Sequence, residues 1–80
     1  MSPEDLLRFL QRRPFEPFRL VLTDGTTYEV HHPEMVLPAR RTAEIGIPQD
    51  QGQPVADRII TVSLLHIVRV EPLQASTTAG

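Results

Sequence analysis

The chain has 80 residues, a formal net charge of −2 at pH 7 and no cysteine. This length indicates one domain, and the lack of cysteine excludes disulfides and thiolate-bound metal. The small negative charge gives the chain as a whole no attraction for polyanions. No apolar run approaches the roughly 20 residues of a membrane span and no signal-peptide pattern opens the sequence, so we expect a cytoplasmic location without membrane contact.

A short helix is expected at residues 3–12. Ser2 is suited to cap it, Pro3 fits its first position, and two acidic residues face the positive end of its dipole. Pro14 ends it, because a proline disfavours helical backbone in the residue before it. At about ten residues the helix would be unstable alone and must pack on the rest of the chain. Its apolar residues are Leu6, Leu7, Phe9 and Leu10.

An Asp-Gly pair between two alternating runs indicates a β-hairpin over residues 18–30. A two-residue loop would pair Leu20 with Glu29 and put apolar and charged side chains on one face. A three-residue loop with Gly25 in the left-handed conformation instead pairs Leu20 with Tyr28, so the apolar residues share a face. We therefore expect the bulged, three-residue loop. Its apolar face holds Phe18, Leu20, Leu22, Tyr28 and Val30.

Five strands are expected in all, and residues 74–80 are expected to form a flexible tail. The strand ranges are 18–23, 26–31, 41–47, 58–62 and 67–71. The polar, turn-rich segment 48–57 is expected to be a surface loop. One N-terminal helix and five short strands in a single domain, residues 1–73, predict a mainly β fold: a small, strongly bent antiparallel sheet or open barrel.

Several features come in a familiar order: an N-terminal helix, a strand–Asp-Gly–strand unit, a variable loop at 48–57, and a short turn from Ser63 into a last apolar strand. In this organisation, over about residues 3–72, the chain resembles the Sm-like family, especially its bacterial RNA-chaperone branch. The resemblance implies an Sm/SH3-like barrel, a ring of copies and RNA binding. Of that branch's Lys-His pair before the last strand, this chain has the histidine, His66, preceded by Leu65.

A second resemblance rests on residues 13–20, the Asp24-Gly25 pair and the His32-Pro33-Glu34 segment. Together they give the pattern R-P-F-x-P-F-R, then D-G, then H-P-E. This pattern is similar to that of a family of short, uncharacterised bacterial proteins. The resemblance implies a common fold and brings no function with it.

No catalytic residue, cofactor site or metal site is predicted. Neighbouring histidines on a strand point to opposite faces, so at most one of His31 and His32 can join His66, while a metal site normally needs three or four protein ligands. Glu34, beside the Pro33 turn, does not complete such a set. No cysteine, nucleophile elbow or glycine-rich phosphate loop is present, so we expect that the chain is not an enzyme.

Arginine supplies all eight basic residues. Arg8 and Arg12 share one face of the expected helix, and Arg40 and Arg41 make a second basic pair. With His66, these residues are the candidate contacts for nucleic-acid phosphates, and a ring would repeat them in each copy. The other interpretation is a solvated helix face on which Glu4 pairs with Arg8.

The expected function is that of a non-enzymatic interaction or assembly module that forms homo-oligomers. Its last strands, at 58–62 and 67–71, are expected to present open edges that pair between copies. The alternative is an Sm-like RNA-binding ring that uses the arginine pairs. A third interpretation is an adaptor that stays monomeric until a protein partner adds a strand.

Overall fold

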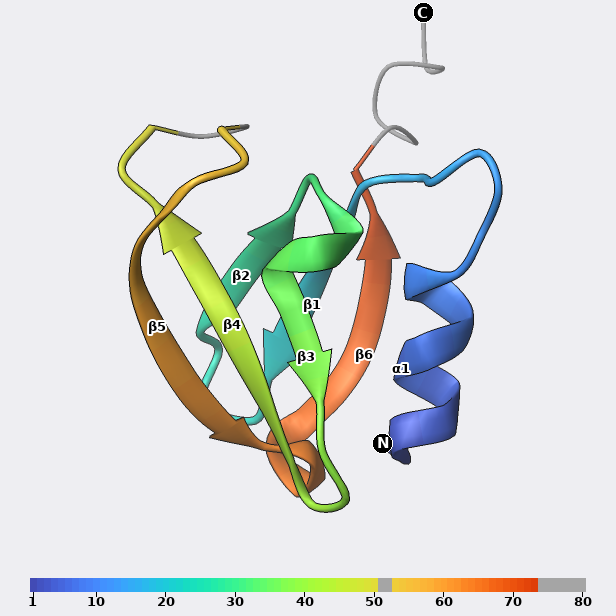
Figure 1. Cartoon of the computed structure of the whole chain (residues 1–80). Helices are drawn as coiled ribbons and strands as arrows, with labels where there is room; N and C mark the ends of the chain where they lie inside the picture. The colour runs from blue at the N-terminus through green and yellow to red at the C-terminus, as the bar shows by residue number, and fades with distance from the viewer. Residues whose placement is uncertain (51–52, 74–80) are drawn as a thin grey trace, which may run out of the picture.

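The computed structural model of the chain describes residues 1–50 and 53–73, and the tail expected at residues 74–80 lies outside them. The described residues form one α-helix, six strands and two single-turn 3-10 helices (Figure 1). In chain order these are α1 (Pro3–Leu10), β1 (Phe18–Leu22), β2 (Thr27–Val30), η1 (Pro33–Met35), β3 (Val36–Pro38), β4 (Thr42–Pro48), β5 (Ala56–Ser63), η2 (Leu64–His66) and β6 (Ile67–Pro72).

Helix α1 begins as expected and ends two residues early. The Ser2 hydroxyl accepts a hydrogen bond from the Asp5 backbone N–H at 3.1 Å. The helix ends at Leu10, four residues before Pro14, which has no N–H to donate to the Leu10 carbonyl; the Arg13 guanidinium donates to that carbonyl at 3.5 Å and to the Arg12 carbonyl at 2.8 Å. Arg12 therefore lies beyond the helix.

Within the described residues, no helix combines the length and apolar character that a membrane crossing requires.

The first hairpin has the predicted register. Phe18 pairs with Val30 and Leu20 with Tyr28, and the Leu22 N–H donates to the Thr26 carbonyl at 2.9 Å. Gly25 has the positive φ, +87°, that the bulged three-residue loop requires. The turn is held further by the Asp24 carboxylate, which accepts from the Thr26 N–H at 2.9 Å. The three-residue loop predicted from the alternation is confirmed.

The fold is mainly β as expected, but the number and arrangement of its strands differ from the five-stranded bent sheet or open barrel that the sequence predicted. Six strands form two antiparallel sheets, ordered β2-β1-β6 and β3-β4-β5, and their described strands do not close into a barrel. The reason is Pro33, which has no N–H for a ladder and starts η1. The second strand therefore stops at Val30, and the chain turns before it resumes as β3, which pairs with β4 in the other sheet.

One hydrophobic core lies between the two sheets and is covered by α1 (Figure 1). Leu6 and Leu10 bring the helix into this core, and burying a leucine stabilises a fold by about 1.5–3 kcal/mol, enough to hold a helix this short. The ring of Phe18 lies between those of Phe9, 5.6 Å away, and Phe15, 5.9 Å away, at the seam between helix and sheet. The buried core residues are Leu6, Leu10, Phe18, Leu20, Val30, Val36, Ala43, Ile45, Val62, Leu64 and Ile67.

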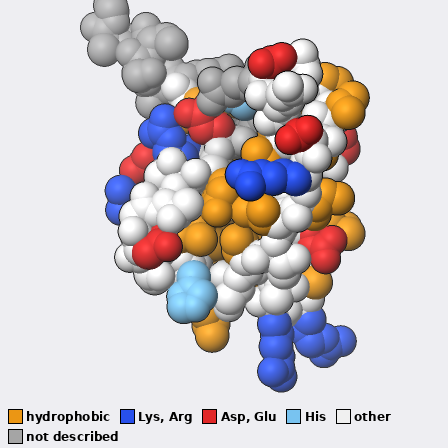
Figure 2. Space-filling model, turned by 90° about the vertical axis from the view of Figure 1, so that its left-hand side faces the viewer, with side chains coloured by type: hydrophobic (Ala, Val, Ile, Leu, Met, Phe, Trp, Pro, Cys, Tyr) orange, Lys and Arg blue, Asp and Glu red, His pale blue; other side chains and the backbone are white. Residues whose placement is uncertain are grey.

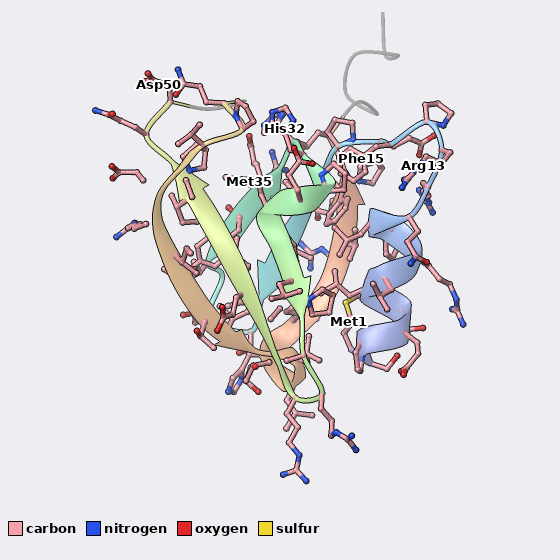
Figure 3. All side chains as sticks on the ribbon, in the orientation of Figure 1. Met1, Arg13, Phe15, His32, Met35 and Asp50 are labelled. Carbon is pink, nitrogen blue, oxygen red and sulfur yellow. The ribbon has the colours of Figure 1, made fainter. Side chains whose placement is uncertain are left out.

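Gly46 on β4 marks a close approach on the outer face of the second sheet. A Cβ atom at this position would lie 3.1 Å from the Cε of Met35 and 3.1 Å from the Cβ of Ala56. The methionine, labelled in Figure 3, therefore covers the backbone at Gly46 from the side of β3. Glycine suits this position because space is tight, since a side chain would require these neighbours to shift by a few tenths of an ångström.

We expect Gly25→Val to lower the melting temperature, because a β-branched residue is strained at positive φ. The left-handed conformation costs a non-glycine residue about 1–2 kcal/mol. No heavy atom lies within 4 Å of the added Cβ, so backbone strain is the whole effect. Gly25→Asn is the matched control, because asparagine tolerates this conformation. Thermal unfolding followed by circular dichroism measures both, and equal melting temperatures for the two variants would contradict the bulged turn.

Candidate functional site

The second predicted basic pair lies at one end of the molecule. Arg40 and Arg41 form the turn between β3 and β4, which the Ala39 N–H closes by donating to the Thr42 carbonyl at 2.7 Å. The Leu64 N–H donates to the Arg41 carbonyl at 2.9 Å, so η2 lies beside this turn. Both arginines are exposed, and Figure 2 shows basic side chains projecting from the bottom of the molecule. Within residues 1–50 and 53–73, neither has an ion-pair partner.

The first predicted basic pair is neutralised by neighbouring acids. Arg8 forms an ion pair with Asp5 at 3.0 Å, and Arg12 forms one with Glu16 at 3.0 Å. The guanidinium of Arg12 also lies 4.7 Å from the centre of the Phe9 ring. Because Arg12 lies beyond the end of α1, the expectation that both arginines share a helix face is wrong. The two arginine pairs therefore differ: one is free to bind an anion, and the other is already partnered.

His66 also lies at the end that carries Arg40 and Arg41, but it is fixed to the first hairpin. Its ring Nδ1 lies 3.3 Å from the Thr23 hydroxyl, and its carbonyl accepts from the Thr23 N–H at 2.9 Å. The histidine thus links η2 to the β1–β2 turn. This contact gives the residue a structural role, which the sequence alone does not indicate.

The remaining histidines do not gather into a metal site. His31 donates through Nε2 to the Glu29 carboxylate at 3.2 Å, and His32 precedes η1. Over the described part of the chain, no group of three His, Cys, Asp or Glu side chains is placed to hold a metal ion.

A ladder of alternating charges crosses the first sheet. Arg19 on β1 lies between Glu29 on β2 and Glu71 on β6, with each ion pair at 3.3 Å. Glu71 also accepts from the Nε of Arg69 at 2.7 Å. The pairing of Arg19 with Glu29 follows from the hairpin register, but the contribution of Glu71 does not, because β1 and β6 are about fifty residues apart in the chain.

The ladder lowers the pKa of both its carboxyl groups. The hydrogen bond from His31 and the charge of Arg19 lower the pKa of Glu29 below its ordinary value of 4.5. Arg69 and then Arg19 do the same to the pKa of Glu71. Both carboxylates are therefore easier to ionise in the folded chain than in the unfolded one. They stabilise the fold above about pH 4.5, and this stabilisation is lost as the pH falls through the folded-state values.

The free sheet edges are unequal in length. Strands β2 and β3 end their sheets with only four and three residues, and β3 includes a proline. Strands β5 and β6 end theirs with eight and six. Each long edge carries one bulge, at Asp57 and at Val68, where the pairing register shifts. A very short edge offers little backbone to pair with, so β5 and β6 are the longer edges for pairing with another chain, although each has a bulge and β6 ends at Pro72.

No protein-family model, no curated protein and no solved structure matches this chain. The likeness to the Sm-like family and to the R-P-F-x-P-F-R pattern therefore remains a prediction. The features that bear on function are the unpaired arginines Arg40 and Arg41, the charge ladder on the first sheet, and the edges at β5 and β6.

We expect Glu29→Gln to destabilise the fold in a pH-dependent way. The gap in melting temperature between the variant and the parent should be largest near pH 7 and should narrow as the pH falls through the lowered pKa of Glu29. Glu44→Gln is the matched control, because this exposed carboxylate has no ion pair within the described residues. A gap that does not change with pH would show that the ladder does not contribute through its charges.

Proposed function

We propose that the chain is a non-enzymatic assembly module that joins copies of itself by pairing β5 of one copy with β6 of the next. The observation that carries this proposal is that the two longest terminal strands belong to different sheets. Each copy thus offers two unlike edges. Pairing β5 with a second β5 would leave every β6 edge uncovered, whereas head-to-tail pairing covers both.

Exposed apolar side chains on both edges support the same proposal. Ile59 on β5 is 67% exposed, and Val68, at the bulge of β6, is 52% exposed. A domain of this size buries only about 60% of the surface that its unfolded chain exposes, so burial between copies would add needed stability. Head-to-tail pairing closes into a ring when the rotation between copies allows it, and we propose such a closed ring.

A second candidate function is supported by Arg40 and Arg41. Two exposed guanidinium groups without a carboxylate partner suit phosphate oxygens, and a ring would present one such pair for each copy. This is the Sm-like RNA-binding alternative that the sequence predicts. Of the two arginine pairs, Arg40 and Arg41 are its proposed RNA contacts. His66 contributes less to it, since its ring faces Thr23.

Self-assembly is tested by the mass in solution. We expect light scattering to give a single discrete oligomer larger than a dimer, and we expect Val68→Asp to reduce it to monomers, because a charge at a paired edge is costly. Leu37→Asp, on a similarly exposed apolar residue of β3, should leave the mass unchanged. Circular dichroism checks that both variants are folded. A monomeric or dimeric parent, or a Val68→Asp variant of unchanged mass, would contradict the proposal.

RNA binding is tested by its dependence on salt. Replacing Arg40 and Arg41 with glutamine should weaken binding to single-stranded RNA and should make the slope of log K against log salt shallower by about 1.4 for each copy in contact. Replacing Arg8 and Arg12 with glutamine is the control, and we expect little change because both are already paired. If the parent chain does not bind RNA, or if the two double variants bind RNA with equal affinity, this function is excluded.

A further inference from the structure

A recess of about 440 Å³ lies at the end of the molecule where four segments meet. The segments are the start of α1, the β3–β4 turn, the end of β5 and η2. Its volume falls within the range of small-molecule pockets. The residues that line it are Met1, Ser2, Pro3, Arg40, Arg41, Ser63, Leu64 and Leu65.

Apolar side chains form much of this recess. Met1 packs against the hydrophobic core, and its amino group donates to the Leu64 carbonyl at 3.1 Å, which holds it against η2. Figure 3 shows Met1 beside α1, on the side that faces the strands. Leu65 is the most exposed of the large apolar residues described, at 84%, although it lies at the rim of this recess. An exposed leucine beside an apolar wall is available to cover a bound apolar group.

The polar groups of the recess are either occupied or cationic. The Ser2 hydroxyl accepts from Asp5, and the Ser63 hydroxyl accepts from the Leu65 N–H at 3.3 Å. Arg40 and Arg41 have no ion pair within the described residues, and no acidic residue lines the recess. The first turn of α1, next to the recess, carries Glu4 and Asp5, and Asp5 is paired with Arg8. The recess thus combines an apolar wall with two guanidinium groups that have no ion pair within the described residues.

We propose that this recess binds a carboxylate carried on an apolar chain. The carboxylate would bind the guanidinium groups of Arg40 and Arg41, whose planar donors match its geometry, and the chain would lie on Met1, Leu64 and Leu65. A bare anion would leave the apolar wall exposed, and an uncharged apolar molecule would leave two arginines without a partner. The proposal is independent of the self-assembly proposed above.

The test is a calorimetric titration of the full chain with decanoate, below the concentration at which it forms micelles. We expect one site per chain. Replacing Arg40 and Arg41 together with glutamine should weaken binding about tenfold or more, because two charge-assisted hydrogen-bonding groups are lost. Leu65→Ser should weaken it as well, without disturbing the core. Arg8→Gln is the control and should stay within about twofold of the parent.

Two further probes separate the contributions of charge and apolar surface. Decanol keeps the chain and lacks the charge, and inorganic phosphate keeps a charge and lacks the chain; we expect both to bind about tenfold more weakly than decanoate or worse. The titration is repeated with Val68→Asp, so that a change in assembly is not mistaken for binding. No heat with decanoate, equal binding of decanol or phosphate, or an unchanged affinity in the double arginine variant would overturn the proposal.

Discussion

The architecture depends on one hydrogen-bond donor that the backbone lacks, the N–H at position 33. Pro33 has no N–H, so the strand that begins at Thr27 cannot continue past the turn of η1. The chain leaves the first sheet there and re-enters a second sheet at Val36. Two short sheets then face each other around one core, and β5 and β6 are their longest terminal strands. The helix, the recess and these two strands are all arranged around this division.

The sequence predicts local structure well where one chain segment holds all the information. The loop at Gly25 follows from the alternation of apolar residues on its two sides, and the start of α1 follows from Ser2 and Pro3. The pairing of β1 with β6 and the separation into two sheets depend on contacts between distant segments, which no local pattern encodes. Strand β3 was missed as a strand because three residues that end in a proline give no alternation to read.

The candidate site shows the same limit in electrostatic terms. All the arginines carry the same charge in the sequence, but a charge that is paired attracts a further anion much less than one that is not. Arg12 is paired because the connector after α1 turns Glu16 back towards it, while Arg40 and Arg41 stand on a turn with no acid in reach among the described residues. Only the fold distinguishes the paired arginines from the unpaired ones, and the unpaired ones lie at the recess beside η2.

Close packing at Gly46 ties together three positions that are far apart in the chain. The Cε of Met35 and the Cβ of Ala56 both lie 3.1 Å from the place where a side chain at residue 46 would begin. The three positions are therefore coupled: a side chain at 46 would press on those at 35 and 56, which would have to shift by a few tenths of an ångström or become smaller. In related chains they should therefore vary as a set, and such covariation would record the meeting of η1, β4 and β5 without any structure being determined.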